Sequence, residues 1–199
     1  MRIIAGIYRG RRLQSLPGTA VRPTSDRVRT ALFNILGQWL EGKRVLDLYA
    51  GIGGVGLECA SRGAAHVTMV EHAADAARCL KSNIALLDAG DRTRVVADDV
   101  FAACERLGAQ GTTFDLIYAD QPYRDAAPRT LLAHLARTGV AHADTIVIIE
   151  HAEWTDETTI AASGWERYRR SAYGKARLSF FSRTQPAATG AHEGTQEES

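Results

Sequence analysis

The sequence predicts an α/β fold in which helices cover both faces of a mainly parallel, seven-stranded sheet. From Arg44 onward, short apolar segments alternate with segments whose apolar residues recur at helical spacing. The apolar segments are nearly continuous, as in 66–71 and 145–150, which is typical of strands buried on both sides. An acidic residue ends or closely follows most of them, which indicates one polar edge where the carboxyl ends of the strands meet.

The expected elements follow in a regular order. Strands are predicted at 45–48, 66–71, 94–96, 114–119 and 145–150, and helices at 55–61, 73–87, 100–107 and 128–137. A segment around Tyr168 and another at 176–181 are expected to pair antiparallel across Gly174 and to close the sheet.

The beginning of the chain stands apart from this alternation. Residues 2–21 are predicted to form a hairpin that lies outside the core. Thr24 or Ser25 can cap a following helix, whose apolar residues continue at helical spacing until the chain nears Gly42. The predicted organisation is an N-terminal hairpin extension at 1–22, one main domain at 23–184 and a disordered tail at 185–199.

Length and composition limit the possible classes of protein. With 199 residues and 45% hydrophobic content, the chain can build one globular domain. No apolar run approaches the roughly 18 residues of a membrane span, and the start lacks the apolar core of a secretory signal, so we expect a cytoplasmic protein without a membrane partner. Cys59, Cys79 and Cys104 lie far apart, which predicts reduced, buried thiols and no metal site. We expect a monomer.

The segment 45–56 carries the strongest motif, because an apolar strand runs directly into closely spaced glycines. Gly51 and Gly53 lack a Cβ, so the backbone can turn tightly near a ligand, while Gly56 lets the next helix approach the strand. The same spacing fits a dinucleotide fold, in which Glu71 stands where a ribose-binding acid is expected. The glycines alone leave NAD and S-adenosylmethionine as alternatives.

Three neighbouring features favour S-adenosylmethionine. Asp47 stands four residues before the first glycine, Tyr49 and Ala50 replace the usual apolar entry, and a second strand ends in Asp120–Gln121–Pro122–Tyr123. An NAD-dependent oxidoreductase would also need residues that handle a hydride, for which the sequence contains no motif.

Carboxylates at strand ends can serve an adenosine ligand. Glu71 is predicted to accept hydrogen bonds from both ribose hydroxyls, and Asp99 one from the adenine amino group, although Asp98 competes for that role. Asp47 either binds the amino-acid part of the ligand or only braces the glycine turn. The predicted cofactor-binding residues are Asp47, Tyr49, Gly51, Gly53, Glu71, Asp99 and Val100.

The catalytic residues are predicted to be Asp120, Gln121, Pro122 and Tyr123. An exocyclic amine on a base is a poor nucleophile, because its lone pair is delocalised into the ring. A carboxylate and a fixed backbone carbonyl can accept its two hydrogens and favour a pyramidal nitrogen that attacks a methyl group in line. Tyr123 would stack on the base.

The net charge is only +1, but its distribution is uneven. The first 29 residues hold seven arginines against one acid, Asp26. Such a concentration attracts a phosphate backbone, although it is also typical of a solvated face. The predicted RNA-binding residues are Arg9, Arg11, Arg12, Arg22 and Arg27.

With these motifs in place, the chain resembles the bacterial 16S ribosomal RNA (guanine(966)-N(2))-methyltransferase family over roughly residues 1–183. The segments that carry the resemblance are 1–6 with 9–11, 22–29 leading to 31–36, 47–51, 57–58 and 61–64. The resemblance implies a Rossmann-like class I methyltransferase fold with an N-terminal hairpin that engages the ribosomal substrate. It further implies S-adenosylmethionine as the donor, 16S rRNA in the small-subunit particle as the partner, and N2-methylguanosine as the product.

The chain departs from that family at two positions. Where the family pattern is Asp-Pro-Pro-Tyr, this chain has Gln121 in place of the first proline. The change keeps the backbone carbonyl but loses the rigid ring. Gly54 stands where the family usually has alanine. The alternative reading is an RNA-binding protein that keeps the fold and has lost catalysis through Gln121.

Overall fold

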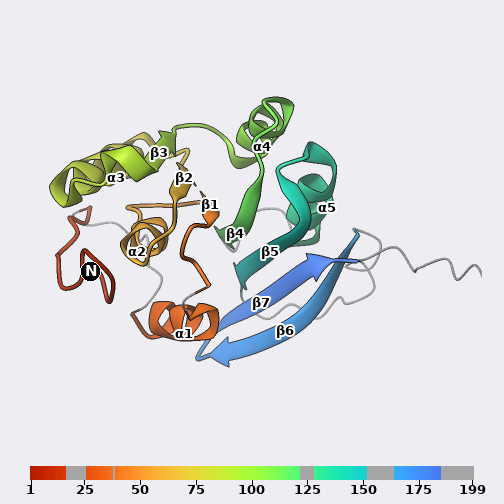
Figure 1. Ribbon diagram of the computed structural model, residues 1–199, viewed down its shortest axis with the longest axis horizontal. Helices are drawn as coiled ribbons and strands as arrows, with labels where there is room; N and C mark the ends of the chain where they lie inside the picture. The colour runs from red at the N-terminus through yellow and green to blue at the C-terminus, as the bar shows by residue number, and fades with distance from the viewer. Residues whose placement is uncertain (17–25, 38, 122–127, 152–163, 185–199) are drawn as a thin grey trace, which may run out of the picture.

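The computed structural model describes residues 1–16, 26–37, 39–121, 128–151 and 164–184, which surround one seven-stranded sheet (Figure 1). The strands are β1 (Arg44–Leu48), β2 (His66–Val70), β3 (Thr93–Val96), β4 (Phe114–Asp120), β5 (Ala141–His151), β6 (Trp165–Tyr173) and β7 (Ala176–Arg183). Their order across the sheet is β3-β2-β1-β4-β5-β7-β6. The strands β1 to β5 are parallel, and β7 is antiparallel to both β5 and β6. The parallel strands and the antiparallel pair of β6 and β7 are as the sequence predicts.

Helices cover both faces of this sheet and enclose two apolar clusters. The helices are α1 (Asp26–Leu36), α2 (Gly56–Ser61), α3 (Ala74–Leu87), α4 (Val100–Ala109) and α5 (Pro128–Thr138), with a short 3₁₀ helix at Gly90–Arg92. One cluster joins the sheet to α1, α2 and α3, and the other joins it to α4 and α5. Within the described ranges, each helix is too short or too polar to cross a membrane.

The strand order places a reversal point at the centre of the sheet. From β1 the chain moves outward through β2 to β3, then returns to β4 on the other side of β1. In sheets of this type, ligands bind at such a reversal point, outside the carboxyl ends of the two strands. Both predicted functional turns, after Asp47 and at Asp120, belong to this edge.

The N-terminal segment differs from its prediction in two respects. Instead of a hairpin ladder, the described residues show a loop closed by one antiparallel bridge between Arg2 and Arg12. The expectation that this segment lies outside the core is wrong, because Ile3 and Leu13 are buried in the cluster beneath α1, α2 and α3. Burying these two apolar side chains stabilises the docked position of the whole segment.

Buried polar groups also hold this segment, which we call the N-terminal arm (residues 1–16). Glu58 is fully buried on α2, and its two carboxylate oxygens accept the N–H groups of Ile4 at 2.7 Å and Ala5 at 2.9 Å. Ser61 accepts the N–H of Tyr8 through Oγ at 2.9 Å. The arm is thereby attached to the helix that follows the glycine turn.

The helix after the arm ends earlier than its apolar spacing predicts. Gly37 adopts φ 56°, and its N–H donates to the carbonyl of Phe33 at 2.9 Å, so the helix stops at Leu36. Leu40 lies beyond the helix but is still fully buried. Its apolar side chain belongs to the core, which explains why helical spacing in the sequence continues past the actual end.

Several predicted features fall outside the described residues. These are Arg22, the cap at Thr24 or Ser25, Pro122, Tyr123, the boundary between 22 and 23, and the tail 185–199. The cysteines are as predicted, since Cys59, Cys79 and Cys104 are free and buried.

Candidate active site

The turn after β1 adopts a backbone conformation that favours glycine. Tyr49, Gly51 and Gly53 have φ values of 60°, 57° and 91°. The turn is tied to its neighbours, because the N–H of Ala50 donates to the carbonyl of Val70 and the N–H of Gly53 donates to the carbonyl of Ala50, both at 2.9 Å. A left-handed tyrosine is uncommon, and such strain is typical of functional turns.

The glycines of this turn have different surroundings. A Cβ on Gly56 would lie 2.6 Å from Met69 Sδ, and one on Gly53 would lie 2.4 Å from Leu80 Cδ1, so both glycines allow close packing with the core. No described atom lies within 4 Å of the position that a Cβ on Gly51 would take. Gly51 therefore presents bare backbone to an open space at the carboxyl edge, which a ligand can approach.

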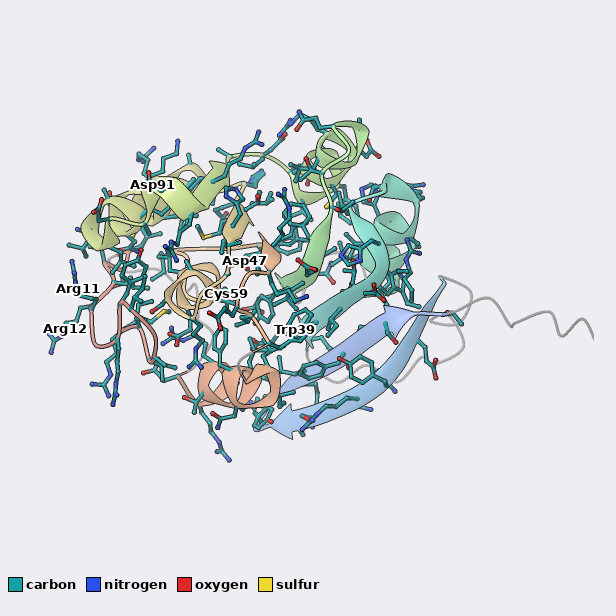
Figure 2. The ribbon with its side chains drawn as sticks, viewed as in Figure 1. Arg11, Arg12, Trp39, Asp47, Cys59 and Asp91 are labelled. Atoms are coloured by element: carbon teal, nitrogen blue, oxygen red, sulfur yellow. The ribbon has the colours of Figure 1, made fainter. Side chains whose placement is uncertain are left out.

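Asp47 braces this turn from inside the protein. It lies near the end of β1 beside α2 (Figure 2), and its Oδ2 accepts the N–H of Gly56 at 2.8 Å. Burial raises the pKa of the Asp47 carboxyl to about 8. The Gly56 N–H opposes this rise in pKa, and the nearby carboxylates of Asp120 and Glu71 add to it. The region between these carboxyls therefore favours a cation.

Glu71 links the end of β2 to the same turn. Its Oε2 accepts the N–H of Gly51 at 2.8 Å, and its Oε1 accepts the N–H of Ala73 at 2.7 Å. An ionised carboxylate offers about four lone-pair sites, so these two bonds orient the group without exhausting it. The geometry brings together Glu71 and Gly51, which are 20 residues apart in the sequence.

Asp98 and Asp99, which compete in the sequence for one role, have distinct positions. Asp99 caps α4, since its Oδ1 accepts the N–H groups of Phe101 and Ala102 at 2.9 and 3.1 Å. Asp98 pairs with Arg106 at 2.5 Å, and this hydrogen bond lowers the pKa of the Asp98 carboxyl. Asp99 is exposed at the carboxyl edge of the sheet, where a ligand can reach it. Asp98 is instead paired with Arg106 on α4.

Val100 follows the cap and is buried among the residues beneath α4 and α5. Its side chain therefore faces the core, so a contact with a ligand would have to come from its backbone N–H. As the first residue of α4, it has an N–H without a partner in the preceding turn of the helix.

Asp120 and Gln121 lie at the end of β4, directly beside the glycine turn. Gln121 is buried, and its Nε2 donates to the hydroxyl of Tyr49 at 3.5 Å, a long contact that bridges the two turns. Asp120 is the register partner of Glu150 on β5. Glu150 is also buried, and its Oε2 accepts a hydrogen bond from the hydroxyl of Tyr118 at 2.8 Å.

Three polar residues that sequence reasoning did not assign to the site connect it to the N-terminal arm. Arg29, fully buried on α1, donates to the carbonyl of Gly54 at 3.2 Å and to that of Arg2 at 2.9 Å. Asn83, buried on α3, donates to the carbonyls of Ile52 at 3.0 Å and Gln14 at 3.2 Å. Glu58 is the third. A polar residue inside an apolar helical stripe is the signal that could have identified Asn83 and Glu58.

The arginines of the arm lie on the outside of the molecule. Arg9, Arg11 and Arg12 are exposed, and Arg11 and Arg12 extend from the left margin of the arm in Figure 2. Arg11 also donates to the carbonyl of Leu86 on α3 at 2.6 Å. Arg27 is exposed on α1, whereas Arg29 is not part of this surface.

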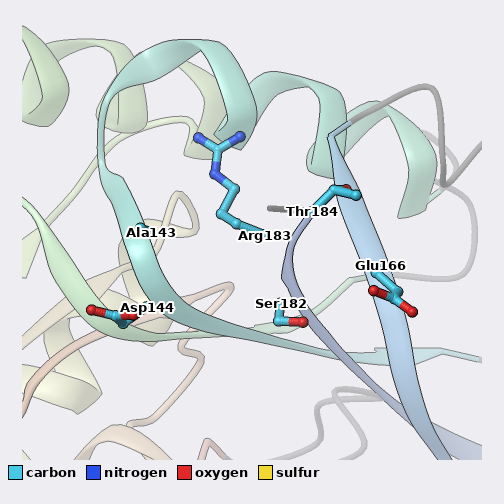
Figure 3. Close-up of a pocket in the computed structure, with 6 residues that line it drawn as sticks. All are labelled: Ala143, Asp144, Glu166, Ser182, Arg183 and Thr184. Atoms are coloured by element: carbon cyan, nitrogen blue, oxygen red, sulfur yellow. The ribbon is translucent and has the colours of Figure 1, made fainter. Parts of the chain in front are cut away.

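A pocket of about 530 Å³ lies elsewhere, at the beginning of β5 and the end of β7 (Figure 3). It is lined by Ala143, Asp144, Glu166, Ser182, Arg183 and Thr184. This is the edge where the parallel strands begin, opposite to the glycine turn. Ligands of such sheets bind at the carboxyl ends of the strands, so the candidate site is the edge with Asp47 and Asp120 and not this pocket.

Known proteins share both this fold and most of this sequence. A family model described as Conserved hypothetical protein 95 matches residues 1–182. Ribosomal RNA small subunit methyltransferase D of Escherichia coli is 32% identical over 183 residues, which are 92% of this chain and 90% of that protein. The enzyme of the same name from Haemophilus influenzae is 29% identical over 83% of this chain and 84% of its own length.

A solved structure agrees with these relatives. The methyltransferase yhhF from Escherichia coli superposes with a TM-score of 0.80 at 32% identity, covering 92% of this chain and 97% of that chain. The class I methyltransferase fold and the family resemblance predicted from the sequence are confirmed. The chain is a methyltransferase and belongs to the family of ribosomal RNA small subunit methyltransferase D.

Proposed function

We propose that this protein transfers a methyl group from S-adenosylmethionine to the exocyclic N2 of a guanine in 16S ribosomal RNA of the small-subunit particle. One observation carries the proposal. The glycine turn after β1 and the Asp120–Gln121 turn after β4 meet at the reversal point of one sheet. A donor bound at the first turn would lie beside an amine held at the second.

The residues at the glycine turn fit the donor. Gly51 exposes backbone to open space, and Glu71, held by the N–H of Gly51, would accept the ribose hydroxyls. Asp99 would accept from the adenine amino group, and the carboxyls around Asp47 would favour the cationic amino-acid end. When bound, S-adenosylmethionine supplies a methyl group activated by its positively charged sulfur. NAD carries no methyl group that could be transferred.

The turn after β4 fits an aromatic amine. Asp120 would accept one hydrogen of the guanine amine, and the backbone carbonyl of Gln121 the other, which turns the nitrogen lone pair toward the methyl group. The transfer would form an N–C bond and break the C–S bond of the donor, which would leave as S-adenosylhomocysteine, and the nitrogen would then lose one proton to the Asp120 carboxylate or to water. Pro122 and Tyr123 complete the proposed turn, with Tyr123 stacked on the base.

The arm would contact the RNA. Its exposed Arg9, Arg11 and Arg12, with Arg22 and Arg27, offer positive charge to the phosphate backbone. We place this reaction in the cytoplasm, where small ribosomal subunits are assembled. A monomer would suffice for the reaction, because one copy of the chain contains the glycine turn, Glu71 and Asp120.

The test measures transfer of labelled methyl groups from the donor to small ribosomal subunits, followed by mapping of the modified nucleotide. We expect one N2-methylguanosine, and we expect Asp120→Ala to abolish transfer while donor binding is weakened far less, because Glu71 and the glycine turn would still hold the donor. Asp144→Ala at the opposite edge is the matched control and should remain active. RNA binding without transfer by the wild type would instead favour the reading of a catalytically inactive RNA-binding protein.

A further inference from the structure

We propose that the β6–β7 hairpin is a second RNA-binding surface, which holds the phosphate backbone of the substrate strand next to the catalytic edge. This inference rests on the proposed function, since its ligand is the ribosomal RNA that the active site would modify. We define the surface, called the hairpin surface, by Tyr168, Arg169, Arg170, Lys175 and Arg177.

The charge of this region is strongly one-sided. Between Gly164 and Thr184 there is one acid, Glu166, at the beginning of β6. The basic residues of the same range are Arg167, Arg169, Arg170, Lys175, Arg177 and Arg183. Arg169, Arg170 and Lys175 are exposed. Such a concentration of positive charge on a protein with a net charge of +1 matches a polyanion.

The topology brings this charge to the active-site edge. Since β5 and β6 are both antiparallel to β7, they run in the same direction, and the β6–β7 turn lies where β5 ends. In register, His151 at the end of β5 pairs with Arg177, which pairs with Ala172 on β6. Figure 1 shows the tip of the hairpin beside α1, at the side of the sheet where β4 and β5 end.

The hairpin surface also presents aromatic area. Tyr168 is 52% exposed, and its ring centroid lies 6.2 Å from that of Phe180. The guanidinium of Arg169 lies 5.8 Å from the centroid of the same Phe180 ring. A buried phenylalanine thus supports both an exposed tyrosine and an arginine. Arginines interleaved with an exposed aromatic ring suit single-stranded nucleic acid, in which a base can stack while phosphates pair with charge.

Another role could explain part of this composition. β6 is an edge strand of the sheet, and charged residues on edge strands prevent pairing with other chains. Edge protection needs no particular sign of charge and no exposed tyrosine. It also does not account for Lys175, which lies in the turn and not on the strand. The combination favours RNA.

The test compares two triple variants that remove equal charge. Arg169→Gln, Arg170→Gln and Lys175→Gln neutralise the hairpin surface. The matched control, Lys81→Gln, Arg92→Gln and Arg94→Gln, neutralises residues of α3, the 3₁₀ helix and β3 at the other end of the sheet. Binding to 16S ribosomal RNA is measured between 50 and 200 mM salt, together with donor affinity.

If the three side chains meet phosphates, the slope of log affinity against log salt falls by about 2 to 2.7. Over this salt range the wild type then loses roughly 20- to 40-fold more affinity than the hairpin variant. The control keeps the slope of the wild type, and donor affinity is the same in all three proteins. Tyr168→Ala weakens binding without changing the slope.

Equal slopes for wild type and hairpin variant would overturn the proposal and leave edge protection as the role of these charges. Lys175→Glu, a single change in an exposed turn, decides the same question if the triple variant does not fold. Failure of this proposal can be distinguished from failure of the proposed function. A wild type that binds RNA but transfers no methyl group would contradict the proposed function. The salt dependence of its RNA binding would still test the hairpin surface.

Discussion

At the scale of single residues, the protonation of Asp47 is the most distinctive property of the site. A carboxyl group with a pKa of about 8 in the folded chain and an ordinary value of 3.8 is protonated in the fold at pH values where the unfolded chain is ionised. Unfolding then releases a proton. The contribution of Asp47 to the free energy of unfolding therefore falls as the pH rises from about 4 to about 8.

We expect Asp47→Asn to remove the decrease in the free energy of unfolding that Asp47 causes as the pH rises. The amide cannot ionise, yet its oxygen still accepts the N–H of Gly56. In urea unfolding at pH 5, 6.5 and 8, the stability of the variant relative to the wild type should rise with pH. Asp91→Asn, which makes the same chemical change at an exposed position, is the control. Parallel pH profiles for Asp47→Asn and the wild type would contradict the raised pKa.

Gln121 permits a second prediction at this scale. Its contact with Tyr49 is long, at 3.5 Å, so losing it should cost no more than about 0.5 kcal/mol, or roughly two- to threefold in rate. We therefore expect Gln121→Pro, which keeps the backbone carbonyl, to stay within about threefold of the wild type in single-turnover rate on small subunits.

Gln121→Ala separates the possible causes if that expectation fails. It removes the contact with Tyr49 but keeps the backbone N–H. A large loss of rate in both variants would assign a role to the side chain, and a loss in the proline variant alone would assign one to the N–H. Either result would show that this chain has built its catalytic turn differently from Asp-Pro-Pro-Tyr.

At the scale of elements, the docking of the N-terminal arm on α2 depends on one glycine. A Cβ on Gly6 would lie 1.8 Å from the carbonyl oxygen of Ser61, which also accepts the N–H of Ile7 at 2.8 Å. The arm can approach the helix this closely only without a side chain. Gly10 has nearly the same φ, 81° against 83°, but no described atom within 4 Å of its Cβ position.

This pair of glycines provides a matched experiment. Both Gly6→Ala and Gly10→Ala introduce left-handed strain, which costs about 1 to 2 kcal/mol. Gly6→Ala must also displace the arm, so we expect a further loss of about 1 to 3 kcal/mol in the free energy of unfolding. Urea unfolding of the two variants measures the difference. Equal losses would mean that the arm can move away from α2 at no cost.

At the scale of the whole molecule, the arm is part of the fold that holds the glycine turn. Ile3 and Leu13 each contribute roughly 1.5 to 3 kcal/mol by burial, and the hydrogen bonds to Glu58, Arg29 and Asn83 add about 0.5 to 1.5 kcal/mol each. The sum is comparable with the total stability of a typical domain, about 5 to 15 kcal/mol.

We therefore expect residues 23–199, expressed without the arm, to lose both thermal stability and donor binding. Circular dichroism melting and calorimetry with S-adenosylmethionine measure these two properties beside the full chain. The arginines of the arm provide the control: replacing Arg9 and Arg12 by glutamine removes charge but leaves the buried contacts, and should keep the melting temperature. A truncated chain that melts like the full protein would establish the arm as an independent extension.

Local patterns in the sequence were sufficient to predict the sheet and to place the candidate site residues at one of its edges. Continuous apolar strands with acids at their ends predicted a parallel sheet with a polar carboxyl edge, because burial on both faces and strand direction leave few alternatives. The glycine turn could also be predicted, since positive φ at Gly51 and Gly53 and close packing at Gly53 and Gly56 favour residues without a Cβ. The family could be recognised for the same reason, because its motifs are local.

Long-range contacts were decided only by the tertiary structure. Helical spacing did not show that α1 ends before Gly37, because Leu40 continues the apolar pattern beyond the helix. Leu40 is apolar because it is buried in the core. Charge in the first residues did not distinguish the exposed Arg27 from the buried Arg29, whose carbonyl partners come from the arm and the glycine turn. The raised pKa of Asp47 likewise comes mainly from burial in the tertiary structure, with a further rise from the carboxylates of Asp120 and Glu71. These properties depend on which distant residues meet, and a linear pattern does not contain that information.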